Sequence, residues 1–167
     1  LEKTLGSPTS ELIRSLWKRS KADPESAWAV PLGVEGDSEP TTLLFDLVAD
    51  GPHALVVGGT GSGKSEFLTS LVIALAASVP PEDLRFVFID YKGGAGLSHL
   101  EGLPHVELSL TDLEGAQTPW LLRALRAEMQ RRKETLRQAG FRSLAEWRQE
   151  HLVGQPRGPA PPPALVV

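Results

Sequence analysis

One glycine-rich stretch carries the clearest chemistry in the chain: Gly58, Gly59, Thr60, Gly61, Ser62, Gly63, Lys64 and Ser65. It matches the pattern G-x-x-x-x-G-K-[ST], in which glycines let backbone N–H groups approach phosphate oxygens closely. A lysine at position 64 can reach the β- and γ-phosphates, and a hydroxyl at position 65 can complete the shell of Mg²⁺. The stretch, with Glu66 after it, predicts a P-loop for a nucleoside triphosphate and Ser65 as a magnesium ligand.

The segments on either side of the loop decide between this prediction and an ordinary glycine-rich turn. The run Ala54-Leu55-Val56-Val57 is apolar throughout and predicts a strand buried on both faces of a parallel sheet. Residues 64–79 lack glycine and proline and predict a largely buried helix, which Pro80-Pro81 stops. A strand before the loop and a helix after it are the context that a P-loop requires.

The other periodic segments predict an α/β chain with a mainly parallel sheet flanked by helices, preceded by a β-hairpin and a lead-in helix. We expect helices over 10–20, 118–139 and 143–151, with Pro119 in the first turn of the long helix and Gly140 at its end. We expect hairpin strands over 30–34 and 41–47, and sheet strands over 84–89, 106–110 and 164–167. Thr111 and Glu114 have capping-box spacing, and the loop 90–102 has room for one helical turn.

Composition sets the limits on function. The chain has 167 residues, the size of one domain, and a formal net charge of −4, from 17 Lys plus Arg against 21 Asp plus Glu. This balance gives no global attraction to nucleic acid or to anionic lipid. Without cysteine, disulfides and thiolate metal sites are excluded, and no histidine pair has zinc-ligand spacing. Because the first residue is leucine, we expect a part of a longer protein.

From Pro81 onward the sequence resembles the motor domain of the FtsK/SpoIIIE family. The resemblance lies in PEDLRFVFID at 81–90, EGLPHV at 101–106, TDL at 111–113 and EMQRR at 128–132, together with Glu66 after the P-loop, and covers roughly 30–140. It implies a RecA-like P-loop ATPase fold, with residues 1–28 as a lead-in and 29–167 as the ATPase domain. It also favours ATP over GTP, and the guanine-reading N-K-x-D pattern is absent.

Within that family, DYKGGA at 90–95 and PLGV at 31–34 resemble the type VII secretion ATPases, EccC or EssC, whereas DNA translocases carry Asp-Pro-Lys at the first place. The resemblance implies partner ATPase modules in the same chain or a homo-oligomeric ring at the cytoplasmic face of the bacterial membrane. The implied substrates are secreted helical-hairpin proteins of the WXG type. Membrane attachment is implied only for the full-length protein.

One departure from the family concerns hydrolysis. The family places an Asp-Glu pair after the strand that follows the proline-rich loop, and the sequence reaches only Val167 there. Because those acids organise the metal and the attacking water, we expect this chain to bind nucleotide and to hydrolyse it poorly.

Three further side chains are candidate catalytic residues beside Lys64. Asp90, with Lys92, follows a strand whose carboxyl end should lie at the ligand edge of the sheet, and the pair either senses the γ-phosphate or its metal or forms an ion pair within the loop. Arg123 and Arg126 lie on the long helix, and each either acts as a finger on a neighbouring subunit's nucleotide or belongs to a solvated face.

Two other functions stay open at this point. The first is a DNA-translocating motor of the same family, which the net charge of −4 does not favour. The second is a regulatory module that holds nucleotide without turning it over, which the intact Lys64 and Ser65 do not exclude.

Overall fold

The computed structural model describes residues 9–23, 26–36, 41–91, 96–111, 117–153 and 158–167. The chain divides into two compact units, Leu1–Pro81 and Glu82–Val167, and each is described by itself. The boundary expected at residues 28 and 29 stays a prediction. Among the described residues, no helix has the length and apolar character needed to cross a membrane.

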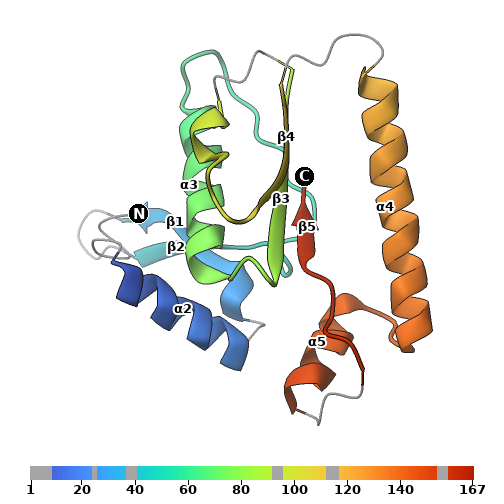
Figure 1. The fold of residues 1–167 in the computed structure, drawn as a ribbon. Coiled ribbons are helices and arrows are strands. Elements are labelled where there is room, and N and C mark those ends of the chain that lie inside the picture. The colour runs from blue at the N-terminus through green and yellow to red at the C-terminus, as the bar shows by residue number, and fades with distance from the viewer. Residues whose placement is uncertain (1–8, 24–25, 37–40, 92–95, 112–116, 154–157) are drawn as a thin grey trace. The chain divides into compact units, whose positions relative to one another are not determined.

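The first unit holds α2 (Ser10–Ala22), η1 (Ser26–Trp28), β1 (Ala29–Glu35), β2 (Thr41–Asp46) and α3 (Lys64–Ser78), as Figure 1 shows. The strands β1 and β2 form the predicted antiparallel hairpin, paired from Ala29 opposite Asp46 to Glu35 opposite Thr41, with a shift of register between Pro31 and Gly33. Asp46 shapes the turn after β2, since its carboxylate accepts from the backbone N–H groups of Val48 and Ala49 at 2.8 and 2.9 Å.

The lead-in helix α2 is packed against α3. Thr9 caps it by accepting from the N–H of Leu12 at 3.2 Å, which is why the helix begins at Ser10 as predicted. Its apolar stripe places Leu16 in the buried interior of this unit. The indole Nε1 of Trp17 donates to the carbonyl oxygen of Ala76 at 3.1 Å, so a directional bond fixes α2 on the second half of α3.

The helix α3 ends within one residue of the predicted 64–79 span. Pro80 has no N–H to continue the helix. The last helical hydrogen bond therefore runs from the N–H of Val79 to the carbonyl of Leu75, at 2.9 Å. The second half of the helix, from Val72 onward, supplies most of the buried residues. The first half is more open, with Phe67 and Leu68 each 37% exposed, so the expected burial holds for the second half only.

The segment before the P-loop departs from the prediction. Residues 54–57 are not a strand, and Leu55 and Val57 are 89% and 82% exposed. Within the described part of the chain no strand pairs with them. The prediction of a buried strand was wrong here. An apolar run indicates side chains that favour burial, but a strand also requires a neighbouring strand that shares its backbone hydrogen bonds.

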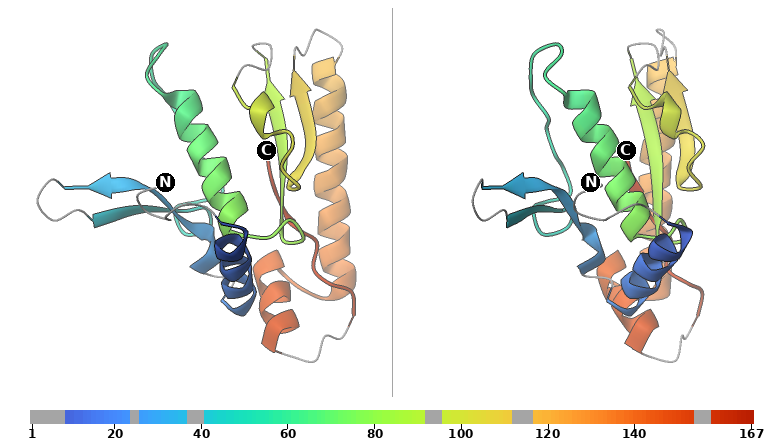
Figure 2. Two further views of the ribbon diagram at one scale, coloured as in Figure 1. Left: turned by 60° about the vertical axis from the view of Figure 1, so that its left-hand side comes forward. Right: turned by 90° about the vertical axis from the view of Figure 1, so that its left-hand side faces the viewer.

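The second unit holds β3 (Leu84–Asp90), η2 (Ser98–Leu100), β4 (Val106–Thr111), α4 (Gln117–Ala139), α5 (Leu144–Val153) and β5 (Ala164–Val166). Its three strands form one sheet in the order β4-β3-β5, and both pairings are parallel, as predicted (Figures 1 and 2). The central strand β3 is the most buried, with Leu84 and Phe86 at most 1% exposed. Phe88 stacks on Phe86 along the same face at 5.8 Å between ring centroids.

Local signals set the ends of both helices in this unit. Gly140 adopts φ +81° directly after α4, a left-handed conformation that favours glycine, and so confirms the predicted helix end. Ser143 accepts from the N–H of Glu146 at 3.1 Å and caps α5, also as predicted. The stacking of Phe141 on Trp147, with ring centroids 5.3 Å apart, packs the connection between the helices. The proposed Thr111 and Glu114 cap lies partly outside the described residues.

Candidate functional site: a phosphate-binding loop

Glycine conformation shapes the loop before α3. Gly61 and Gly63 have φ values of +76° and +85°, in the region that residues with a Cβ disfavour. Gly58 is required for a different reason, because a Cβ there would lie 2.5 Å from the Oγ of Ser62. The N–H of Ser62 donates to the carbonyl of Gly59 at 3.3 Å and closes the turn. Glycine at positions 61 and 63 therefore suits the conformation of the turn that leads into α3.

Lys64 places the only side-chain cation of the loop sequence against its backbone. The Nζ atom donates to the carbonyl oxygens of Gly58 and Gly59 at 2.6 and 2.5 Å. The ammonium group thus lies over the first turn of the loop, next to the residues whose N–H groups the sequence pattern assigns to phosphate. The positive charge is therefore close to the loop, and it can exchange its carbonyl partners for phosphate oxygens.

The start of α3 offers a second set of donors. Gly63 caps the helix without a side chain, and the first intrahelical bond runs from the N–H of Phe67 to the carbonyl of Gly63 at 2.9 Å. Among the described residues, no acceptor pairs with the N–H groups of Lys64, Ser65 and Glu66. These groups and the positive end of the helix dipole favour an anion at this position.

The remaining predicted ligands are open to solvent. Thr60, Ser62, Ser65 and Glu66 are all exposed, and Ser65 and Glu66 lie in the first turn of α3. A hydroxyl in that turn is of the right chemistry for one place in a magnesium shell, which is otherwise filled by water and phosphate oxygens. The residues present therefore fit a magnesium-bound triphosphate. Three features support this: the close approach of Gly58 to Ser62, the ammonium group of Lys64, and the uncapped amides at the start of α3.

Asp90 lies in the second unit, as the last residue of β3. It is half-buried and sits opposite Thr111 in the parallel register with β4, so it marks the carboxyl edge of the sheet, where α/β proteins bind ligands. Its role as a sensor of phosphate or metal stays a prediction. Lys92, its proposed companion, lies outside the described residues.

The arginines of α4 fall into two groups. Arg131 and Arg132 both bond to Glu128, at 2.6–2.7 Å, and Arg137 bonds to Glu134 at 2.6 and 2.9 Å. The hydrogen bond from Arg131, and a weaker contribution from Arg132, lower the pKa of Glu128 from 4.5 to about 2, against the partial burial that raises it.

Arg123 and Arg126 are exposed and form no ion pair within the described residues. Of the arginines on α4, these two have guanidinium groups that no helix partner engages. A role on a neighbouring molecule stays a prediction for both, and the structure favours them over the paired arginines for it.

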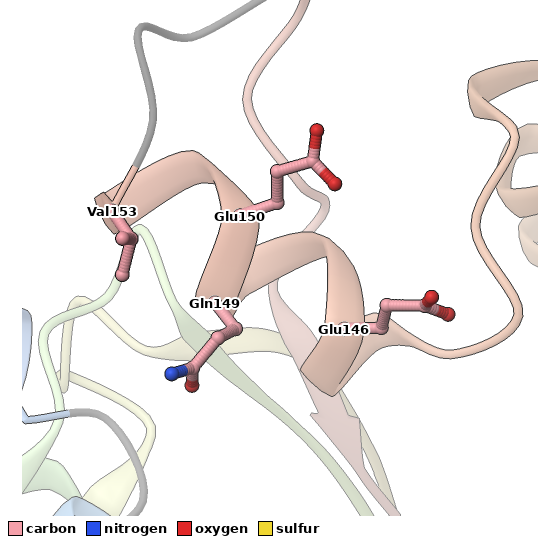
Figure 3. A pocket seen from close by; sticks show the side chains of 4 residues that line it. All are labelled: Glu146, Gln149, Glu150 and Val153. Carbon is pink, nitrogen blue, oxygen red and sulfur yellow. The ribbon is translucent and has the colours of Figure 1, made fainter.

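A hollow beside α5 has the wrong chemistry for phosphate. Figure 3 shows its lining side chains, Glu146, Gln149, Glu150 and Val153, all projecting from that single helix. Two carboxylates repel a polyanion, and Glu146 already accepts from the backbone N–H of Arg142 at 2.9 Å. The P-loop therefore remains the candidate site for nucleotide.

Sequence reasoning missed two arginines: Arg132 donates to the Pro163 carbonyl just before β5, and Arg148 donates to the Asp83 carbonyl just before β3 and to the Pro162 carbonyl. Their charge was visible in the sequence, but their acceptors lie 31 and 65 residues away along the chain. The available signal was Pro161-Pro162-Pro163, a stretch without any backbone N–H that can be held only through its carbonyl groups.

Comparison with known proteins gives relatives from type VII secretion systems. The ESX secretion system protein EccC of Thermomonospora curvata is 44% identical over 139 residues, which are 79% of this chain and 10% of that protein. The type VII secretion system protein EssC of Staphylococcus aureus is 40% identical over 105 residues, 63% of this chain and 7% of that protein. The chain thus spans about a tenth or less of the length of these relatives.

Solved structures agree with the sequence relatives. The cytoplasmic domain of the T. curvata type VII secretion ATPase EccC matches with a TM-score of 0.81 and 36% identity, over 99% of this chain and 20% of that one. A structure of ATPases 2 and 3 of T. curvata EccC with a signal sequence peptide matches with a TM-score of 0.68 and 26% identity, over 81% of this chain and 25% of that one. The model of the FtsK/SpoIIIE family matches residues 11–157, and the chain belongs to that family.

Proposed function

We propose that the chain is an ATP-binding module of a type VII secretion ATPase and that nucleotide turnover in the assembled protein energises protein export. The observation that carries the proposal is a glycine-shaped loop that holds the Lys64 ammonium group directly before the uncapped start of α3. The relatives EccC and EssC support the assignment to secretion rather than to DNA translocation.

The residues of the loop divide the work of holding the triphosphate. The N–H groups from Gly61 to Ser65 bind phosphate oxygens, and Lys64 turns from its carbonyl partners toward the β- and γ-phosphates. Ser65 holds Mg²⁺, which when bound neutralises charge that develops between the β- and γ-oxygens. Glu66, in the same first turn, lies where an acidic side chain favours the helix start.

The finer assignments form part of the proposal. Asp90 responds to the γ-phosphate or its metal, and Arg123 or Arg126 contacts the nucleotide of a neighbouring module, supplied either by the same chain or by a homo-oligomeric ring. The substrates are secreted helical proteins of the WXG type, which fits the signal peptide bound by the relative EccC. The site of action is the cytoplasmic face of the bacterial membrane, in line with the cytoplasmic domains of the relatives.

Nucleotide binding is tested by calorimetric titration of the chain with Mg-ATP. Lys64→Ala removes a charged donor, which contributes about 1.5–3 kcal/mol, so the Kd should rise about 10- to 150-fold. Lys18→Ala is the matched control, since Lys18 is exposed on α2 in the same unit, and should leave Kd unchanged. Equal affinity of the two variants would contradict the proposal.

The export role is tested in the complete protein by measuring ATP turnover with two additions. A signal-bearing WXG-type protein should raise the rate, and duplex DNA should not. If DNA stimulated turnover instead, with a rate that fell steeply as salt increased, the chain would belong to a DNA motor. Bound nucleotide that is never turned over under either condition would indicate the regulatory module.

A further inference from the structure

The short segment before β5 can be held in place only from outside. Pro161-Pro162-Pro163 has no backbone N–H, so it donates no hydrogen bond to a neighbouring strand. The first donor is the N–H of Ala164, which bonds to the carbonyl of Asp83 at 2.8 Å. The carbonyl groups of these prolines are therefore the only backbone groups through which the segment can form hydrogen bonds.

Arg132 of α4 supplies one donor to these carbonyl groups. Its Nη1 donates to the carbonyl of Pro163 at 2.5 Å, and its Nε donates to Glu128 at 2.7 Å. The guanidinium group is planar and binds at two sides, so Glu128 fixes the plane in which the other side meets the carbonyl. Only 21% of the Arg132 side chain is exposed, which limits competition from water.

Arg148 of α5 supplies the other. Its Nη2 donates to the carbonyl of Asp83 at 2.6 Å and contacts that of Pro162 at 3.5 Å. Asp83 directly precedes β3, so this one side chain joins the beginnings of β3 and β5. Burial lowers the pKa of the Arg148 guanidinium, and the nearby charge of Arg132 lowers it further, against the opposite pull of Asp83.

The bonds matter because β5 has little of its own to fix its register. It pairs with β3 over three residues, Ala164 to Val166 opposite Leu84 to Phe86. A slip by one residue would turn every side chain of the strand to the other face of the sheet. The pairing is parallel, so the carboxyl end of β5 points to the same edge of the sheet as Asp90 at the end of β3.

We infer that Arg132 and Arg148 are positioning residues for nucleotide turnover: together they set the register of β5 and so place whatever this strand presents at the ligand edge of the sheet. The inference rests on the proposed ATPase function. Neither arginine belongs to the phosphate loop, so their replacement should change turnover without changing nucleotide affinity.

The test uses Arg132→Leu and Arg148→Leu in the complete protein, with Arg131→Leu as the matched control. Arg131 also bonds to Glu128, but within the described residues it makes no hydrogen bond to the segment before β5. Hydrogen exchange at the Ala164 amide, the Kd for Mg-ATP, and kcat and KM are measured for each. A displacement of about 1 Å at a reacting centre can cost on the order of 100-fold in rate, so we expect kcat to fall by tenfold or more.

The expected result is a split: faster exchange at Ala164 and lower kcat for both leucine variants, with Kd and KM within twofold of the parent. Arg131→Leu should resemble the parent. Arg132→Lys and Arg148→Lys retain the charge and one donor, and should restore part of kcat, which also covers a leucine variant that fails to fold.

Two outcomes separate the inference from the function beneath it. If the unmodified protein turns over ATP and the variants exchange faster at Ala164 yet keep the parent kcat, the positioning role is wrong. If the unmodified protein does not bind Mg-ATP, the proposed function is wrong and the inference fails with it.

Discussion

The phosphate loop and the segment before β5 are two irregular stretches that are held in opposite ways. The loop is fixed from within, by glycine conformations and by Lys64 bonding to carbonyl groups five and six residues away. The segment before β5 is bonded from outside, by arginines 14 and 31 residues from the proline carbonyls that accept from them. A site shaped by its own backbone geometry can stay open to a ligand. A strand that only positions other groups can instead be held by side chains whose hydrogen bonds are already used within the protein.

The largest expected effect concerns the packing of β3, the strand that pairs with β5. Phe86→Ala removes a side chain that is 1% exposed at the centre of β3, and should cost about 3–5 kcal/mol of unfolding free energy. Denaturant unfolding of the chain measures it. Leu122→Ala, at a position 61% exposed on α4, should cost no more than about 0.5 kcal/mol. Similar losses for both would mean that the sheet does not depend on this packing.

The dependence of the phosphate loop on glycine conformation is tested by a pair of glycine variants. Gly61→Ala forces a Cβ into φ +76°, at a cost of about 1–2 kcal/mol, which should weaken Mg-ATP binding about 5- to 30-fold. Gly59→Ala meets no atom within 4 Å and should bind more tightly than Gly61→Ala. The measurement is the Kd of each variant by calorimetry. The reverse order of affinities would show that contact with phosphate, rather than loop conformation, determines which glycines matter.

The same division explains what the sequence could predict. The loop, the hairpin and the ends of α4 were predictable because their signals lie within a few residues: the glycines, Pro119 and Gly140. The state of residues 54–57 was not, because an apolar run does not say which strand will accept its hydrogen bonds. The hydrogen bonds of Arg132 and Arg148 to distant carbonyl groups were not predictable either, because a charged residue in the sequence does not identify the carbonyl group to which it donates.

A smaller effect concerns the bond between α2 and α3. Trp17→Phe retains an aromatic ring but removes the indole donor to the Ala76 carbonyl, and should cost about 0.5–1.5 kcal/mol. Thermal unfolding measures the change. Trp120→Phe, at a position 52% exposed on α4, serves as the control and should change little. An unchanged unfolding temperature for Trp17→Phe would mean that apolar packing suffices to hold α2.

The smallest effect is a response to acid. Because the folded chain holds the pKa of Glu128 at about 2, below 4.5, its contribution to stability is complete above pH 4.5 and is lost as the pH falls toward 2. The carboxylate is partly exposed, so the loss should be at most about 1 kcal/mol. Urea unfolding at pH 6 and pH 3 measures it. Glu128→Gln should show a smaller drop than the parent, and equal drops would exclude this carboxylate as the cause.

The indole bond of Trp17 also has a mechanical meaning. Ala76 lies 12 residues beyond Lys64 on the same uninterrupted helix, which corresponds to about 18 Å along its axis. A helix resists stretching because every turn is bonded to the next. A pull on α2 is therefore transmitted along a stiff helix whose first residue is Lys64, so force applied to α2 would reach the proposed nucleotide site.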